Sequence, residues 1–248
     1  MHASWSEVGM HVYLYLISAN YVSTKRFAAL SRRLEELAPK PAMAIRLEAD
    51  GVGLWQALDT LRARGARRID LRPVGLPFSQ SLENWLPGAA GAWCAQQNGV
   101  PPEVFFASSP EHDDDVIRAV ASAEVSLQRV VDRPRGEIGK GWDLPPPHQH
   151  HLLVCTGPRC HLKDAPNLAD HLKSEIRRAG LGDSCLVTTT GCVFPCNAGP
   201  VIVHYPRGDW YRVPDLSEIQ RFVKTVLVQG GRLEHLIFHQ TGVSHETA

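Results

Sequence analysis

The sequence predicts an α/β protein built of two domains. Three observations support this prediction. In the first half, apolar β-forming runs alternate with segments of helical period; a stretch with three consecutive prolines then interrupts the pattern; and the second half has a different order of elements. We therefore expect an N-terminal parallel-sheet domain over residues 1–132, a linker over 133–149 and a second domain over 150–248.

The first half contains four predicted strands and four predicted helices. The strands are short β-forming runs over residues 12–18, 43–47, 68–76 and 104–107. The helices carry apolar residues every three or four positions, over residues 22–37, 52–64, 82–97 and 113–131. This alternation favours a parallel sheet with helices on both faces. We expect the third helix to be broken near Pro87, because proline removes a helical hydrogen bond.

The second half is predicted to run strand, helix, strand, hairpin, helix. The strands lie over residues 152–154, 185–189, 201–205 and 210–213, and the helices over 166–179 and after 215. Pro166 and Gly180 mark the two ends of the first of these helices, and Asp215 caps the second. The order is that of a thioredoxin-like fold.

Charge and hydropathy exclude several classes of protein. Lysine plus arginine and aspartate plus glutamate both number 26, so bulk charge gives no support for a nucleic-acid partner. No apolar run reaches the roughly 18 residues of a membrane helix, and no signal peptide is recognisable. We therefore expect a cytoplasmic protein, in which the six cysteines serve metal or redox chemistry rather than disulfides.

Four cysteines form two pairs, each after a predicted strand. Four residues separate Cys155 from Cys160, and three separate Cys192 from Cys196. Loops after neighbouring strands can direct four thiolates to one place, and a 2Fe–2S cluster takes four thiolate ligands. Structural zinc is compatible with the same spacings. A redox dithiol is not, since its Cys-x-x-Cys motif is absent, so spacing places the cluster only modestly ahead of zinc.

The motifs themselves resemble a known family. The stretches CTGPRCHLKDAPNLADHLK and TTGCVFPCNAGPVIVHYPRGDWYRV resemble the two cluster loops of thioredoxin-like 2Fe–2S ferredoxins, which include a domain of the small peripheral subunit of respiratory complex I. The resemblance implies a 2Fe–2S cofactor, one-electron transfer to a redox protein partner, and a domain that is often a homodimer. It also implies the ligands, hereafter the four motif cysteines: Cys155, Cys160, Cys192 and Cys196. Cys94 and Cys185 lie outside the motifs, and we interpret them as packing residues.

The first half resembles a diverged half of the CbiX cobaltochelatase family. The resemblance rests on LWQALDTLRARGARRIDLRPVGLPFSQSLENWLPGAAGAWCAQ and VFFASSPEHDDDVIRAVA, and it implies a tetrapyrrole ligand. That family places histidines in two loops, but residues 17–23 and 76–85 contain none here. Imidazole can take up pyrrole protons and deliver a metal ion, so its absence argues against metal insertion. We therefore expect this domain to bind a tetrapyrrole without inserting a metal. The expected pocket residues are Ser18, Asn20, Ser79, Gln80 and Glu83.

Other charged and aromatic residues have less specific interpretations. Arg159, His161 and Lys163 could dock an acidic redox partner, but a solvated face is the favoured interpretation. Trp210 and Tyr211 are expected to pack in the hairpin.

Two further histidine groups and an acidic cluster could suggest metal sites. The cluster of His112 with residues 113–115 is better explained by capping of a helix start. Histidines 148, 150 and 151 are placed in the linker. His235 and His239 lie four apart on a possible terminal helix, and two ligands without a third are weak evidence for a metal.

These observations leave three hypotheses. The leading one is a two-domain 2Fe–2S electron-transfer protein whose N-terminal domain binds a ligand or a partner. The second is a tetrapyrrole metal chelatase with an accessory cluster. The third is a scaffold with a structural metal. Absorption and electron paramagnetic resonance (EPR) spectra separate the first from the third.

Overall fold

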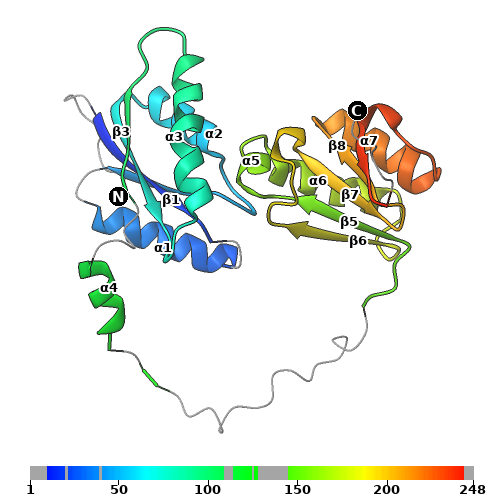
Figure 1. The fold of residues 1–248 in the computed structure, drawn as a ribbon, viewed down its shortest axis with the longest axis horizontal. Helices are drawn as coiled ribbons and strands as arrows, with labels where there is room; N and C mark the ends of the chain where they lie inside the picture. The colour runs from blue at the N-terminus through cyan, green and yellow to red at the C-terminus, as the bar shows by residue number, and fades with distance from the viewer. Residues whose placement is uncertain are drawn as a thin grey trace.

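The computed structural model describes residues 10–19, 22–38, 41–108, 114–124, 126–127 and 145–242. We refer to residues 10–124 as the N-terminal part and to residues 145–242 as the C-terminal part. Each part contains its own sheet, as Figure 1 shows. No helix among these residues has the length and apolar character needed to cross a membrane.

The N-terminal part alternates strands and helices as predicted. Its elements are β1 (Met10–Ile17), α1 (Thr24–Leu37), β2 (Ala42–Arg46), α2 (Leu54–Ala63), β3 (Ala66–Val74), α3 (Gln80–Ala95), β4 (Glu103–Phe106) and α4 (Asp114–Ala121). The strands form a four-stranded sheet in the order β2-β1-β3-β4, and every neighbouring pair is parallel. The carboxyl ends of β1, β2 and β3 therefore meet at one edge, where Ile17 is level with Arg46 and Val74.

Side-chain alternation places the core on one face of this sheet. Val12, Leu14 and Leu16 of β1 are fully buried and pack with apolar residues of α2 and α3. By contrast, α1 buries no side chain, although Glu35 accepts a hydrogen bond from the Ala44 amide of β2. Helices were expected on both faces of the sheet. Buried packing is provided by α2 and α3 on one face, whereas α1 buries no side chain.

Two helix predictions need correction. α3 runs through Pro87 without a break. Leu86, Ala89, Ala90 and Trp93 on either side of the proline are buried in the core, and this burial outweighs the lost hydrogen bond. α4 ends at Ala121, whereas the sequence predicted a helix to residue 131; residues 123 and 124 are already outside it.

The C-terminal part has a mixed sheet. Its elements are β5 (His150–Cys155), α5 (Pro158–His161), α6 (Ala165–Arg178), β6 (Cys185–Thr190), a 3₁₀ turn (Cys196–Ala198), β7 (Val201–Tyr205), β8 (Asp209–Arg212), α7 (Leu216–Phe222) with a π-helical extension (Val223–Val228), a second 3₁₀ turn (Glu234–Leu236) and β9 (Ile237–Gln240). The sheet order is β6-β5-β7-β8-β9, with β5 and β6 parallel and the other pairs antiparallel.

The histidines of the C-terminal part lie in other elements than the sequence predicted. His235 lies in a 3₁₀ turn and His239 in the edge strand β9, so the two residues do not share a helix. His150 and His151 belong to β5 rather than to a linker. Asp215 does cap its helix, by accepting a hydrogen bond from the Glu218 amide over 3.0 Å.

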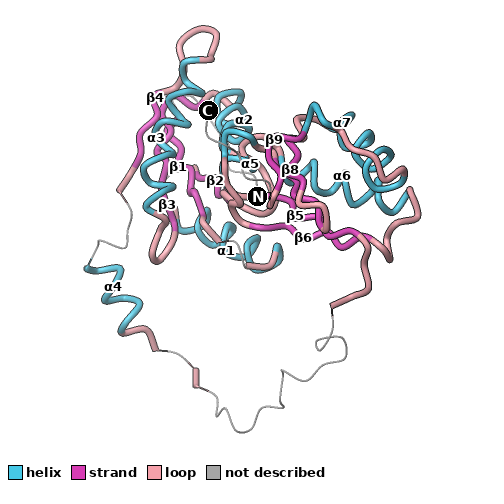
Figure 2. Tube along the Cα trace, turned by 45° about the vertical axis from the view of Figure 1, so that its right-hand side comes forward, coloured by secondary structure: helices cyan, strands magenta, loops and turns pink. Residues whose placement is uncertain are grey.

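The two parts touch through the segment that carries α5. Figure 1 shows α5 on the side of the C-terminal part that faces α2 and α3, and Figure 2 shows it beside α2 as well. Leu162, just after α5, packs against the N-terminal core. The Ala49 amide donates to the Thr156 carbonyl over 3.2 Å. The carboxyl edge of the parallel sheet is therefore in contact with the loop that follows β5.

Candidate metal centre

The parallel pair β5 and β6 brings the two cysteine loops together. Cys155, the last residue of β5, is level with Thr190, the last residue of β6. Both loops consequently leave the same edge of the sheet. Thr156 ties them further, because its amide and its hydroxyl both donate to the Thr190 carbonyl, over 3.0 and 2.8 Å.

The four motif cysteines line one cavity of about 310 Å³. Within it the sulfurs are grouped in pairs. Cys192 Sγ lies 3.3 Å from Cys196 Sγ, and the thiols of Cys155 and Cys160 share a hydrogen bond. No three histidine, cysteine, aspartate or glutamate side chains of the described ranges gather closely enough to hold one metal ion together. The arrangement is thus two pairs of thiols around a shared space.

The two pairs differ in exposure. Cys155 and Cys160 are each 2% exposed, Cys196 is half-buried and Cys192 is exposed. A hydrogen bond from Cys160, helped by the amides of Val193 and Gly157, lowers the pKa of Cys155 to about 6 despite burial. The same bond raises the pKa of the Cys160 thiol, its donor. Although the Cys192 side chain reaches solvent, partial desolvation of its thiol and the adjacent Cys196 thiol raise its pKa. The inner pair therefore has hydrogen bonds that stabilise a thiolate.

Two glycines permit the close approach of the loops. A Cβ atom on Gly199 would lie 2.5 Å from Cys160 Sγ, and one on Gly157 would lie 2.9 Å from the Cys192 backbone. A side chain at Gly157 would therefore require the Cys192 backbone to move, and one at Gly199 would displace the Cys160 sulfur or the loop backbone. This close backbone packing brings amides near the sulfurs, as the contacts of Cys155 show.

The charged residues near the first loop only partly match the solvated face favoured from the sequence: Lys163 is exposed and Arg159 is half-buried, but His161 is buried. His161 is 3% exposed, and its Nε2 donates to the Asp50 carbonyl over 3.1 Å; burial lowers its pKa. Lys163 Nζ donates to the Gly199 carbonyl over 3.0 Å, which links the two loops.

Arg159 contacts both a cysteine and the N-terminal part. Its Nη1 donates to Cys196 Sγ over 3.5 Å, and its guanidinium carbon lies 5.2 Å from the centre of the Trp85 ring. Arg159 is thus the residue that connects α3 to the sulfur of a motif cysteine.

The N-terminal part supplies one wall of the cavity. That wall consists of Glu48, Ser79, Ser81, Leu82 and Trp85. The carboxylate of Glu48 is buried and accepts hydrogen bonds from the Ser18 hydroxyl and the Ala19 amide, over 2.8 and 3.3 Å; burial raises its pKa. No histidine is among the residues that line this cavity.

The expected pocket residues are therefore only partly brought together. Ser79 lines the cavity, and Ser18 reaches it indirectly through Glu48. Gln80 and Glu83 are not among the lining residues, and Asn20 lies outside the described residues. Sequence reasoning missed Glu48 and Trp85. Glu48 comes two residues after the end of β2 and directly after the buried Leu47, and this position at the end of a predicted strand was the available signal.

The remaining expectations are mostly confirmed. Cys185 is buried in the C-terminal core, and Cys94 packs against the N-terminal core. Tyr211 is fully buried, and Trp210 donates to the Thr241 hydroxyl over 2.9 Å. Asp114 and Asp115 occupy the first turn of α4, while His112 and Asp113 lie outside the described residues.

Comparison with known proteins gives two similarities. No protein-family model matches the chain. A 2Fe–2S ferredoxin from Clostridium pasteurianum is 27% identical over 96 residues, which cover 36% of this chain and 94% of that protein.

Among solved structures, a thioredoxin-like [2Fe–2S] ferredoxin from Aquifex aeolicus is 25% identical, with a TM-score of 0.37 over 39% of this chain and 96% of that one. A CbiX protein of cobalamin (vitamin B12) biosynthesis from Marinobacter aquaeolei is 16% identical, with a TM-score of 0.38 over 45% of this chain and 91% of that one. Part of this chain is therefore similar to thioredoxin-like 2Fe–2S ferredoxins, and the chain has a CbiX protein among its structural neighbours.

Proposed function

We propose that this chain is a one-electron carrier with a 2Fe–2S cluster held by the four motif cysteines. The observation that carries the proposal is the grouping of four thiols, two and two, around one cavity. A 2Fe–2S cluster needs two thiolates on each of two irons, and this arrangement supplies them. A single zinc ion needs four ligands around one point, which the paired arrangement supports less well. Similarity to 2Fe–2S ferredoxins points the same way.

The residues around the thiols suit such a group. When bound, a 2Fe–2S cluster supplies one-electron oxidation and reduction. Amides of Val193 and Gly157 stabilise charge on the Cys155 sulfur, and Arg159 does so on Cys196. Gly157 and Gly199 keep the two loops in contact, so the site does not have to be assembled by a large movement of the backbone.

Electrons would be exchanged with a redox protein at the exposed side of the site. Cys192 is exposed, and the neighbouring Phe194 is 70% exposed. The N-terminal part lines one wall of the same cavity. We propose that this part binds a ligand of its own, and the CbiX-like resemblance makes a tetrapyrrole the candidate. We also propose that residues 1–132 and 150–248 form separate domains and that the protein assembles as a homodimer.

The test is spectroscopic. Anaerobically purified protein is examined by absorption and EPR before and after dithionite, with iron and acid-labile sulfide quantified. A reducible signal with about two irons and two sulfides per chain is the expected result. A colourless protein with stoichiometric zinc would contradict the proposal and would make the cysteines structural.

A further inference from the structure

Arg159 lies where the cysteine site meets the N-terminal part. It lines the cysteine cavity, and it also lines a neighbouring cavity formed largely by α3. On one side its Nη1 donates to Cys196 Sγ over 3.5 Å. On the other side its guanidinium carbon lies 5.2 Å from the centre of the Trp85 ring. One cation therefore contacts a sulfur of one part and an aromatic ring of the other.

Contacts on both sides of Arg159 hold its segment against the N-terminal part. Before it, the Thr156 carbonyl accepts a hydrogen bond from the Ala49 amide over 3.2 Å. After it, His161 donates to the Asp50 carbonyl over 3.1 Å, and Leu162 packs on the N-terminal core. The position of the Arg159 backbone relative to α3 is thus set by the contacts that Thr156, His161 and Leu162 make with the N-terminal part.

The indole of Trp85 constrains the guanidinium itself. A cation over a tryptophan face within about 6 Å is attracted to the ring, and the attraction grows when the pair is shielded from water. Arginine has a long side chain with many rotamers, so such a contact determines where its charge lies. Without Trp85, the guanidinium would be free to turn away from Cys196 toward solvent.

We propose that the N-terminal part raises the reduction potential of the cluster through Arg159, with Trp85 as the positioning residue. The inference rests on the proposed function, since it presupposes the cluster. Uptake of one electron adds one negative charge among the sulfurs, and a guanidinium hydrogen-bonded to one of them stabilises that charge.

The test is a redox titration of the full chain, with midpoint potentials read from absorption and from the EPR signal. Arg159→Ala should lower the equilibrium constant for reduction about tenfold, which is about 59 mV for a one-electron couple. Arg159→Lys should fall between wild type and Arg159→Ala, because it keeps the charge but loses the planar group that stacks on the ring.

Trp85 is tested by a double-mutant cycle. Trp85→Ala should lower the potential by a smaller amount, and Trp85→Phe should restore most of it. In the Arg159→Ala background, Trp85→Ala should have no further effect, because its influence passes through Arg159. The control is Trp55→Ala: Trp55 lines the neighbouring cavity but not the cysteine cavity, so the potential should not change.

The outcomes separate this inference from the proposed function. A wild-type protein without a 2Fe–2S signal would defeat the proposed function. A normal signal with the same potential in wild type, Arg159→Ala and Arg159→Lys would defeat only the inference. An equal shift from Trp85→Ala with and without Arg159 would also overturn it, since Trp85 would then act by shielding alone. If Trp85→Ala does not fold, as judged by circular dichroism, Trp85→Leu replaces it in the cycle.

Discussion

The two ends of strand β5 bury reactive side chains to the same degree and with opposite results. Cys155, at the carboxyl end of β5, is 2% exposed. At the amino end of β5, His150 contacts His204 of the neighbouring strand β7, and His204 is 1% exposed. Hydrogen bonds lower the pKa of Cys155 to about 6, toward the charged form. Burial, with His150 and Arg207 nearby, lowers the pKa of His204 to about 4, toward the neutral form.

The difference lies in the polar groups that surround each side chain. Cys155 receives hydrogen bonds from a thiol and two amides. Among the described residues the His204 side chain has one hydrogen-bond contact, in which its Nε2 lies 3.0 Å from His150 Nδ1. Its own Nδ1 has no hydrogen-bond partner there. Burial alone therefore favours the neutral form, whereas burial among donors creates a site for a charge.

The largest expected effect separates the two ends directly. Cys155→Ser should reduce bound iron and sulfide at least tenfold, because a serine hydroxyl is a poor substitute for a buried thiolate. His204→Gln should leave both unchanged, since the histidine end does not contact the site. Cys192→Ser should reduce iron less than Cys155→Ser, because Cys192 is exposed and water can approach. The measurement is iron and sulfide per chain after anaerobic purification.

Equal iron loss in His204→Gln and Cys155→Ser would contradict the comparison. Both ends of β5 would then contribute to one cooperative unit, and cluster retention would report stability rather than ligation. Far-UV circular dichroism of the three variants distinguishes loss of metal from loss of fold.

The next effect tests how tightly the cysteine end is packed. Gly199→Ala places a methyl group only 2.5 Å from Cys160 Sγ, so the sulfur or the backbone of the loop must shift. We expect a loss of about 2 kcal/mol in the free energy of unfolding and a severalfold loss of bound iron. Gly182→Ala is the matched control, because nothing lies within 4 Å of its added methyl group. Wild-type iron content in Gly199→Ala would show that the loop adapts more freely than the structure suggests.

A third effect concerns stability at the histidine end. Asp209 is level with His204 in the sheet, is fully buried, and accepts two hydrogen bonds from Arg232, over 3.0 and 2.6 Å. Arg232→Ala leaves this carboxylate without its counter-ion and should lower the free energy of unfolding, by less than for a fully buried pair because Arg232 is partly exposed.

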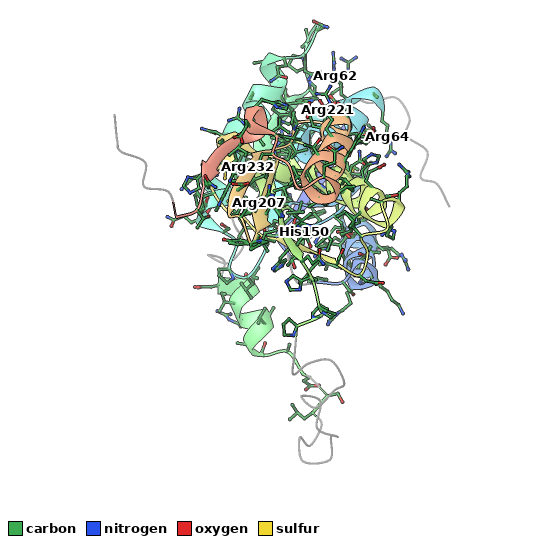
Figure 3. All side chains as sticks on the ribbon, turned by 90° about the vertical axis from the view of Figure 1, so that its right-hand side faces the viewer. Arg62, Arg64, His150, Arg207, Arg221 and Arg232 are labelled. Atoms are coloured by element: carbon green, nitrogen blue, oxygen red, sulfur yellow. The ribbon has the colours of Figure 1, made fainter. Side chains whose placement is uncertain are left out.

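Urea unfolding measures this cost. Arg221→Ala is the control, because Arg221 is exposed and its partner Glu218, unlike Asp209, is not fully buried. Figure 3 labels Arg221 together with Arg232, Arg207 and His150 on this side of the molecule. Iron content should not change in either variant. Loss of iron in Arg232→Ala would mean that the two ends of the sheet are not independent.

The sequence predicted the local features of this molecule well. Period and end signals were sufficient for β1 to β8, because each strand shows an apolar run with turn residues at its ends. Pro166, Gly180 and Asp215 marked helix ends for the same local reason. The grouping of the two cysteine pairs was also accessible, because parallel neighbouring strands bring their loops to the same edge.

What the sequence did not reveal depends on contacts between distant segments. The helix through Pro87 is maintained by core packing, and β9 forms by pairing with β8. The burial of His161 and the contact of Arg159 with Trp85 join residues that are far apart in the chain. A charged residue gives no local sign of whether it meets solvent or another part of the molecule, so the solvated face expected for His161 was wrong.

The smallest expected effect is a pH dependence that originates at the histidine end. His204 has a pKa of about 4 in the folded protein and about 6.5 when unfolded. Between these values the unfolded chain binds the proton and the folded chain does not, so stability falls as pH decreases from 6.5 toward 4. From pH 7.5 to 5.5 this amounts to about 1 kcal/mol.

The other groups that influence His204 are His150, Arg207 and Asp209, and they also contribute to the pH dependence of the wild type. The quantity to measure is therefore a difference. Urea unfolding of wild type and His204→Gln at both pH values gives four free energies, and the pH-dependent loss should be about 1 kcal/mol smaller in the variant. An identical loss in both proteins would mean that His204 takes up its proton without unfolding. The contrast between the two ends of β5 would then rest on the cysteine end alone.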